Sequence, residues 1–439
     1  MAKIRPFKGY TYNKDKISDM SNVVVPLKYN MTDEEKSKFY EMDEYNISRI
    51  FDGKSYPSDT GKSNKYSRAA EYLDQWIKDG VIVCDEEDAI YLYEEVIEMH
   101  GNTYSNTTFV ALLELEELGE ANIHSCEEIR QLSKKDRYDL LAATKTDLSM
   151  ISCLYVERGK KLLNIMNEQR ESEPYLEFVM PDGLTQRLWK ITDKALMDEI
   201  TEEFKDLPLY ITDGQTRYST CVKYRNYMRE NDPEVTGDEA YNYAMVSLFN
   251  SNSDGVVIMP EHRAIKLPDG FSEELFVALI QDHFKIEKII VDAQDDSITE
   301  TMKKQIMTRR QQSIFAVYQD SNYFYRITLT DPDYIKKELL PDMSEAYCGL
   351  DTVVLRKLII NDVLGIKDDY DELVSTSVSS RECYNAVQRG DADVMIAMNP
   401  VKVEQIESVT AAGETMPFRT VSMFPKPFVG TLMYIKSDK

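Results

Sequence analysis

The spacing of hydrophobic residues alternates along the chain between the two-residue period of strands and the three-to-four-residue period of helices. Two pairs of apolar segments enclose turn-forming residues, a pattern that predicts β-hairpins. These hairpins comprise residues 90–99 with 104–115 and residues 175–180 with 185–191. The arm at 90–99 also has a spacing compatible with a helix, and that alternative stays open.

Further helices are predicted where apolar residues recur at helical spacing between capping and helix-stopping residues. They comprise residues 68–78, 130–143, 193–205, 217–229, 272–283, 299–311, 350–363, 381–389 and 401–412. Short apolar runs predict strands at residues 209–211, 241–249, 256–259, 286–291, 313–318, 323–329, 394–398 and 429–434. Thr192 is the predicted N-cap of the helix that ends near Lys205, and residues 52–67 are predicted to form an exposed loop. Since hairpins are interspersed with helices, we expect an α+β or mixed α/β fold with mixed sheets.

The 439 residues exceed what a single ordinary core accommodates, so two or three domains are expected. The chain becomes richer in predicted helices after Pro332, which places one boundary there. We therefore predict one or more main α+β domains over residues 1–331, and a C-terminal α/β segment over residues 332–439 that packs on them.

Acidic residues outnumber basic ones, 77 to 52, and give a formal net charge of −25. Such a chain repels nucleic-acid phosphates and anionic membranes, so neither is an expected partner. The first residues contain no apolar signal segment, no run is apolar enough to span a membrane, and the six cysteines are scattered. These features predict reduced thiols and a cytoplasmic location. Self-association into a homo-oligomer is left open.

Two familiar kinds of site are not supported by the spacing of residues. The Gly-Lys-Ser triplets at Gly53 and Gly61 lack the first glycine of a phosphate-binding loop and do not follow an apolar strand. The four histidines form no HxH or HxxxH pair, so no metal ligands are predicted. The many carboxylates leave an oxygen-ligated magnesium ion open.

The segment from Leu209 to Tyr218 has the most specific chemistry. An apolar strand ends, Asp213 and Gly214 form a turn, and a helix follows with Arg217 in its first turn. Unpaired N–H groups at the start of a helix, together with a guanidinium, suit a phosphate or carboxylate ligand. Residue types alone favour a simpler alternative, in which Asp213 caps the helix and Arg217 pairs with a neighbouring carboxylate.

Besides the Asp-Gly turn, a set of further segments follows in order nearly from end to end of the chain: Ile4–Phe7, Lys135–Thr144, Asp147–Ser149, Leu188–Asp193, Met259–Arg263, Asn399–Pro400, Val403–Gln405, Ala412–Pro417 and Phe424–Lys426. By their order and spacing, these segments resemble a bacterial family of proteins of unknown function, DUF1015. The departures described below make this chain a divergent member.

The turn in that family usually contains Asp-Gly-His-His-Arg, which resembles the nucleotide-binding turn of the ParB and sulfiredoxin-like superfamily. That superfamily includes nucleoside triphosphatases and free-serine kinases, and members of the family tend to be encoded beside serine-biosynthesis genes. The resemblance therefore implies a small-molecule or nucleotide ligand and a link to serine metabolism. The cofactor stays undetermined, with ATP or ADP and Mg as the form that a kinase implies. The phosphate- or ligand-binding residues implied are Asp213, Gly214, Gln215, Thr216, Arg217, Asp136, Arg137, Arg263 and Lys426.

This sequence departs from the family at polar positions of its motifs. Gln215 and Thr216 replace the two histidines of the turn, and Cys126 replaces the histidine of a His-Glu-x-Thr motif, which leaves Glu127. Glutamine and threonine donate hydrogen bonds but do not titrate near neutral pH. We therefore expect binding to outlast catalysis, with Glu127 and His262 as candidate catalytic residues.

Two functions follow, and whether the protein is an enzyme stays open. The favoured one is a catalytically altered paralogue of a small-molecule enzyme, which binds phosphate, a nucleotide or a phosphorylated metabolite. The alternative is an active phosphotransferase that resembles the free-serine kinases. A DNA-associated relative of ParB is disfavoured by the net charge of −25 and the lack of a basic stripe. Residue types alone also allow Asp136 and Arg137 to form a merely structural ion pair.

Overall fold

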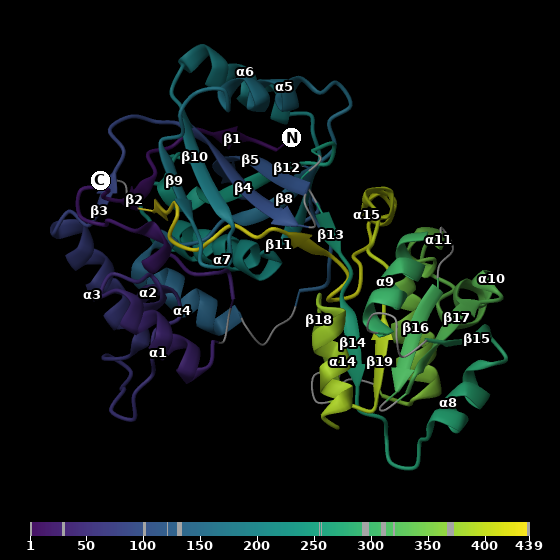
Figure 1. Ribbon diagram of the computed structural model, residues 1–439. Coiled ribbons are helices and arrows are strands. Elements are labelled where there is room, and N and C mark those ends of the chain that lie inside the picture. Colours follow the sequence, from purple (N-terminus) through teal and green to yellow (C-terminus); the bar gives the residue numbers. More distant parts are fainter. Residues whose placement is uncertain are drawn as a thin grey trace. The chain divides into compact units, whose positions relative to one another are not determined.

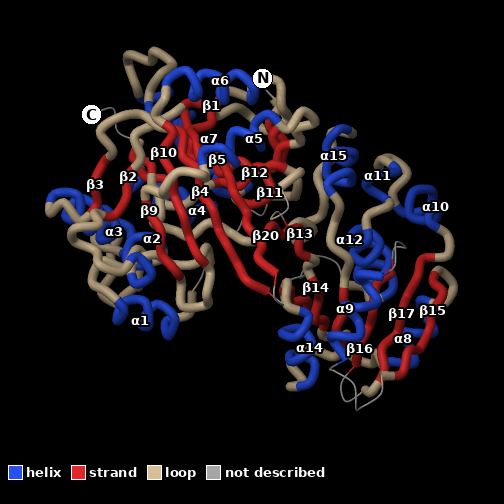
Figure 2. Tube along the Cα trace, turned by 45° about the horizontal axis from the view of Figure 1, so that its top comes forward, coloured by secondary structure: helices blue, strands red, loops and turns tan. Residues whose placement is uncertain are grey.

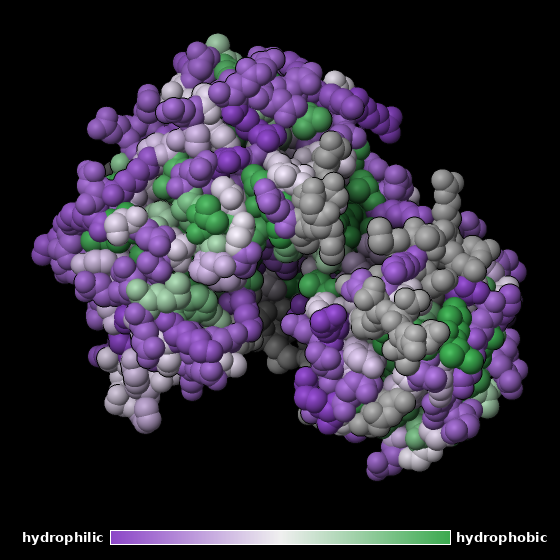
Figure 3. Space-filling model, viewed as in Figure 1, coloured by the Kyte–Doolittle hydropathy of each residue, from purple (hydrophilic) through white to green (hydrophobic). Residues whose placement is uncertain are grey.

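The computed structural model describes residues 2–28, 31–99, 102–120, 122–129, 134–253, 255, 257–291, 298–308, 313–318, 321–366 and 373–436. These residues divide into two compact units (Figure 1). The first unit comprises Met1–Ser125, Ile129–Val257 and Met423–Lys439, and the second comprises Cys126–Glu128 and Ile258–Ser422. In Figure 3, hydrophilic residues cover most of the visible surface, in agreement with the 29 % of charged residues. No helix among the described residues is long and apolar enough to cross a membrane.

A mixed sheet forms the centre of the first unit (Figure 2). Its strands, in spatial order, are β6 (Ile123–Ser125), β11 (Leu209–Asp213), β8 (Ile151–Tyr155), β12 (Tyr243–Asn250), β5 (Asn102–Glu114), β4 (Ile90–Met99), β10 (Thr185–Ile191) and β9 (Leu176–Val179), with β1 (Ile4–Arg5) paired to β5. The pairs β6–β11 and β8–β12 are parallel and the others are antiparallel. Both predicted hairpins, β4–β5 and β9–β10, are confirmed, and the arm at 90–99 is a strand.

Four helices of the first unit follow the predicted segments 68–78, 130–143, 193–205 and 217–229 with shifts at their ends, whereas the helices over residues 33–42, 48–51 and 161–169 were not predicted. The helices of this unit are α1 (Asp33–Met42), α2 (Ser48–Phe51), α3 (Lys65–Lys78), α4 (Lys134–Thr144), α5 (Lys161–Gln169), α6 (Lys194–Phe204) and α7 (Gln215–Asn231), with short 3-10 turns η1 (Met20–Asn22) and η2 (Ala240–Asn242). The N-cap of α6 is Asp193, whose carboxylate accepts the Leu196 N–H, and not Thr192 as predicted. The carboxylate at the next position supplies the acceptor, so the helix begins one residue later.

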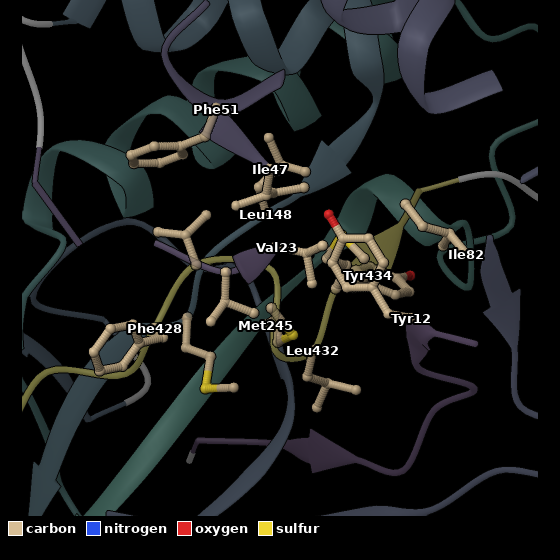
Figure 4. Close-up of a cluster of buried hydrophobic side chains, with 14 of the residues drawn as sticks. Tyr12, Val23, Ile47, Phe51, Ile82, Leu148, Met245, Phe428, Leu432 and Tyr434 are labelled. Carbon is tan, nitrogen blue, oxygen red and sulfur yellow. The ribbon is translucent and has the colours of Figure 1, made fainter. Parts of the chain in front are cut away.

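Each face of the sheet in the first unit has its own hydrophobic core, because successive residues of a strand point to opposite faces. On β4, Tyr91 and Tyr93 belong to one core, whereas Ile90 and Leu92 belong to the other. The first core includes side chains from the C-terminal segment, among them Phe428, Leu432 and Tyr434 (Figure 4). The prediction of one continuous strand over 429–434 is wrong: Val429 and Met433 form single β-bridges with Val25 and Tyr10, and the segment enters a ladder only at β21 (Tyr434–Ile435), which pairs with β7 (Thr146–Asp147).

An antiparallel sheet forms the second unit, together with helices. Its strand order is β15 (Phe284–Ile290), β17 (Tyr323–Leu329), β16 (Ser313–Tyr318), β19 (Val394–Ala397), β14 (His262–Ile265) and β18 (Val374–Ser377). The helices are α8 (Glu273–Ile280), α9 (Ile298–Thr308), α10 (Pro332–Tyr334), η3 (Ile335–Leu339), α11 (Glu345–Cys348), α12 (Asp351–Val353), η4 (Val354–Val363), α14 (Ser380–Gln388) and α15 (Val403–Ala411). Two further strand pairs in the chain are β2 (Tyr10–Tyr12) with β3 (Ile82–Cys84), and β13 (Val257–Met259) with β20 (Ser422–Phe424).

The division into units differs from the predicted boundary near Pro332. Strand β19 follows that boundary in sequence, yet it pairs with β14 and β16, which precede it. Elements on either side of Pro332 therefore share one sheet, and the compact units divide at Val257–Ile258 and at Ser422–Met423 instead. The mixed α/β class, with mixed strand directions and several hairpins, is confirmed.

Candidate functional site

The predicted strand–turn–helix around Gly214 is present in the first unit. Strand β11 ends at Asp213, Gly214 has a φ of +92°, and α7 begins at Gln215 with no side-chain cap among the described residues. A Cβ at position 214 would lie 2.6 Å from Nη2 of Arg217, so both the backbone angle and the space favour glycine. Because no side chain caps α7, its first N–H groups keep their capacity to bind an anion.

The Asp213 carboxylate lies between two cations. Its Oδ2 is 2.8 Å from Nη2 of Arg217, and its Oδ1 is 3.0 Å from Nζ of Lys426. Burial acts to raise the pKa of Asp213, but the charges and hydrogen bonds of Lys426 and Arg217 outweigh it and hold the pKa well below its usual value. The Arg217 guanidinium also donates to the carbonyl of Met150, at 2.8 Å. Asp213 thus orders both cations and compensates part of their charge.

A cavity of about 50 Å³ adjoins this cluster within the first unit. That volume exceeds several-fold what one ordered water requires. Arg217 from α7 and Arg137 from α4 both line it. The remaining lining residues are Phe51, Leu140, Leu141, Thr146, Asp147, Leu148, Ser149, Ile151, Thr220 and Cys221. Two guanidiniums from different helices therefore meet at one mostly apolar cavity, which is the arrangement that strengthens their interaction with an anion.

Asp136 and Arg137 have separate environments although they are adjacent on α4. The Asp136 carboxylate accepts hydrogen bonds from Nζ of Lys65 (2.5 Å) and from the hydroxyl of Tyr66 (2.8 Å). Burial acts to raise its pKa, but these two donors and the charge of Arg137 lower it below the usual value. Arg137 is buried, with its guanidinium carbon 5.4 Å from the centre of the Phe51 ring and Nη1 3.7 Å from Asp136. Arg137, and not Asp136, therefore lines the cavity.

The two residues that replace the histidines of the turn are both partly buried. Nε2 of Gln215 donates to the carbonyl of Ile211, at 3.0 Å, so this amide is hydrogen-bonded to the backbone of strand β11. Thr216 lies in the first turn of α7, where its carbonyl accepts the hydroxyl of Thr220. Both residues help to hold the turn, and neither supplies a titratable group at neutral pH.

The second unit contains Glu127, which is 6 % exposed. Its carboxylate accepts the backbone N–H groups of Arg419 (3.2 Å), Thr420 (2.8 Å) and Val421. Burial raises the pKa of Glu127 to about 7, although the three N–H donors act to lower it, and the carboxylate of Glu261 adds to the rise. Glu127 is thus a buried carboxyl group that changes its charge near neutral pH.

His262 and Arg263, both candidate site residues in the sequence, belong to β14 and are buried. Nδ1 of His262 accepts the N–H of Met398, at 3.1 Å. The Arg263 guanidinium donates to the carbonyls of Glu261 (2.6 Å) and Arg419 (2.8 Å). The segment is a buried strand because it pairs on both sides, with β18 and β19. These hydrogen bonds within the second unit give both side chains a structural role.

Of the predicted site residues, the structure brings together Asp213, Gly214, Arg217 and Lys426, and it places Arg137 at the same cavity as Arg217. Sequence reasoning missed Ser149 and Thr220 as lining residues, although Ser149 lies in a quoted motif and Thr220 lies one turn beyond Thr216. No group of three or more histidine, cysteine, aspartate or glutamate side chains that would hold a metal ion occurs in the part of the chain that the structure describes.

Comparisons with solved structures find distant likenesses. SbnI with a C-terminal truncation, from Staphylococcus aureus, is 12 % identical, with 70 % of this chain and 82 % of that chain covered and a TM-score of 0.33. A conserved hypothetical protein from Pyrococcus furiosus is 11 % identical, with 71 % and 90 % covered and a TM-score of 0.32. A free serine kinase in complex with AMP is 12 % identical, with 72 % and 88 % covered and a TM-score of 0.34.

A comparison with curated proteins finds no match. In contrast, the profile of the family described as "Protein of unknown function (DUF1015)" matches residues 4–353, which is most of the chain. This match includes the Asp-Gly turn and the Asp136–Arg137 segment. The chain belongs to the DUF1015 family.

Proposed function

We propose that this protein binds phosphate, or the phosphate group of a small molecule such as a nucleotide or phosphorylated metabolite, in the first unit. The observation that carries the proposal is that Arg137 and Arg217, from two different helices, line one cavity beside the uncapped start of α7. Guanidinium groups bind phosphate oxygens in pairs, and helix N-termini favour negative charge. Lys426 adds a third cation, held against Asp213.

The replaced histidines favour binding without turnover. Gln215 and Thr216 do not exchange protons near neutral pH, and loss of a general acid or base typically lowers a rate about a hundred- to ten-thousand-fold. Charge and hydrogen-bond donors, in contrast, persist in Arg137, Arg217 and the α7 N–H groups. We therefore propose a catalytically altered paralogue that recognises its ligand by the phosphate group.

A thermal-shift screen with inorganic phosphate, AMP, ADP, ATP and phosphoserine tests the proposal. A ligand at about 100 times its Kd stabilises the fold by about 2.7 kcal/mol, whatever its chemistry. Arg217→Ala and Arg137→Ala should each weaken binding at least about tenfold, because a charge-assisted hydrogen bond contributes about 1.5–3 kcal/mol. Arg158→Ala, at an exposed arginine of the same unit, is the matched control. No stabilisation by any of these anions, or equal affinities in all three variants, would contradict the proposal.

A second function, phosphoryl transfer to a serine-like metabolite, is favoured by one observation, the pKa of about 7 of Glu127. A carboxyl group with that pKa suits a general acid or base at neutral pH. Incubation with serine, ATP or ADP and Mg²⁺ should then yield phosphoserine, and Glu127→Gln should abolish it while Glu128→Gln, at an exposed neighbour, should not. Binding without any product leaves the paralogue as the function.

A further inference from the structure

Strand β4 contains two consecutive glutamates, each 1 % exposed, whose side chains point to opposite faces of the sheet. Glu94 has charged partners: its Oε1 is 2.5 Å from Nη2 of Arg170, and its Oε2 is 3.0 Å from Nη1 of Arg187. This pairing is the usual condition for burying a carboxylate. The two arginines therefore explain how Glu94 can be buried in its ionised form.

Among the described residues, no cation pairs with Glu95, on the other face. Its register neighbours are Gln186 on β10 and Asn106 on β5, so three polar side chains form one row across three strands. All three are at most 2 % exposed. Within the described ranges, neither oxygen of Glu95, neither polar atom of the Asn106 amide, nor Nε2 of Gln186 has a hydrogen-bond partner. We call these residues the cross-strand row.

The charged and titratable groups around Glu95 do not favour its ionised form. The structure places Asp182, in the turn between β9 and β10, and Tyr93, on β4, near Glu95. Neither is a cation, and the facing residues of β5 and β10 are uncharged amides. Burial, with a smaller contribution from Asp182, raises the pKa of Glu95 well above its ordinary value. A carboxylate in such a place has no compensation for its lost hydration.

The cross-strand row also contacts the C-terminal segment. The Tyr93 hydroxyl donates to Oε1 of Gln186 and accepts the N–H of Phe428, at 3.2 Å. Phe428 lies two residues beyond Lys426, which pairs with Asp213. Glu95 is the register neighbour of Gln186, and hydrogen bonds lead from Gln186 through Tyr93 to Phe428, two residues from the lysine of the proposed phosphate site.

We propose that Glu95 is an uncharged carboxylic acid in the folded protein at neutral pH, and that its ionisation loosens the C-terminal segment that holds Lys426 against Asp213. The neutral form supplies an O–H donor beside the orphaned amide oxygen of Asn106, its register neighbour, which an ionised carboxylate cannot supply. The consequence for ligand affinity rests on the proposed phosphate site, whereas the protonation state of Glu95 does not.

Glu95→Gln and Glu94→Gln are a matched pair that tests the protonation state. Glutamine copies the shape and hydrogen-bonding capacity of a neutral acid, so Glu95→Gln should keep or raise the folding equilibrium constant at pH 7, with a gain that grows as pH rises to 9. Glu94→Gln removes the partner of two arginines, and it should lower that constant at least about tenfold or prevent folding. Urea unfolding measured between pH 5 and pH 9 gives both constants. A loss for Glu95→Gln equal to that for Glu94→Gln would overturn the proposal.

The difference between the infrared spectra of the wild-type and Glu95→Gln proteins at pH 7 detects the proton directly. The wild-type protein should show the carbonyl stretching band of a buried protonated carboxylic acid, and Glu95→Gln should lack it. Glu127 is present in both proteins, so its carboxyl band cancels in the difference. A spectrum without this band, or a fold stabilised specifically by added Na⁺ or K⁺, would show an ionised Glu95 with a bound cation and would also overturn the proposal.

Amide hydrogen exchange of Phe428 tests the coupling without any ligand. Its protection factor should fall at least about tenfold from pH 7 to pH 9 in the wild-type protein and stay constant in Glu95→Gln. If the protection factor of Phe428 changes with pH equally in the two proteins, the proposed coupling between Glu95 and the C-terminal segment is overturned. The affinity for inorganic phosphate should then decline with pH in the wild-type protein only. If the wild-type protein binds no phosphate at any pH, the proposed function fails, while the exchange and infrared measurements still decide the role of Glu95.

Discussion

Asp213 and Glu127 are candidate-site carboxylates in different units, and their pKa values shift in opposite directions. Asp213 faces Arg217 and Lys426, and its pKa lies below the usual value. Glu127 faces three backbone N–H groups, and its pKa is raised to about 7. N–H dipoles satisfy hydrogen bonds but carry no net charge, so they compensate less of the cost of burying an ion. The comparison shows that the kind of partner, more than the number of hydrogen bonds, decides the protonation state.

The largest change in stability is expected for Asp213→Asn, which removes the carboxylate and leaves Arg217 and Lys426 facing each other. We expect a loss of about 3–5 kcal/mol in the free energy of unfolding at pH 7, because removal of one partner leaves buried charge uncompensated. Since the two cations are then available, phosphate affinity should rise and phosphate should restore part of the stability. Urea unfolding with and without phosphate measures both effects. Unchanged affinity would mean that the two cations do not contact the ligand.

Glu127→Gln tests the carboxyl group whose pKa is raised. A raised pKa in the folded state means that the stability from protonation is fully present below the ordinary pKa of 4.5 and is lost as pH rises through about 7. The wild-type protein should lose about 3 kcal/mol over this range, since one pKa unit corresponds to about 1.4 kcal/mol. The variant should lack that part of the pH dependence. Urea unfolding at pH 5 and pH 8 measures the difference, with Glu128→Gln as the control, and parallel profiles would contradict it.

Gly214→Ala should have the smallest effect. At a φ of +92° an alanine is strained by about 1 kcal/mol, and its Cβ would displace the Arg217 guanidinium, 2.6 Å away. We therefore expect a loss of about 1 kcal/mol in stability together with weaker phosphate binding. Gly183→Ala is the control, because Gly183 also has a positive φ but its Cβ would meet no atom within 4 Å of the described structure. Equal phosphate affinity in both variants would argue against a role for the Arg217 position in binding.

Local pattern was a good guide to the elements of the fold. The hairpins β4–β5 and β9–β10 and the turn at Gly214 depend on residues close in sequence, and all three are confirmed. The failures came where long-range pairing decides the outcome. Residues 262–265 form a buried strand because β18 and β19 pair with them, whereas residues 429–433 form no continuous strand because only Val429 and Met433 find backbone partners, at Val25 and Tyr10.

The family, the mixed class of the fold and the strand–turn–helix that presents Arg217 could all be predicted from the sequence. Each depends on residue order or on neighbours within a few positions. Which charged and polar groups pair with one another could be seen only in the folded structure. Asp213 pairs with a lysine 213 residues away, and Glu127 accepts N–H groups from residues 419–421. The adjacent Glu94 and Glu95 are the same residue type in the same strand, yet within the described part of the chain arginines pair with Glu94 and no cation pairs with Glu95. Protonation depends on burial and on partners from distant segments, and neither is a property of local sequence.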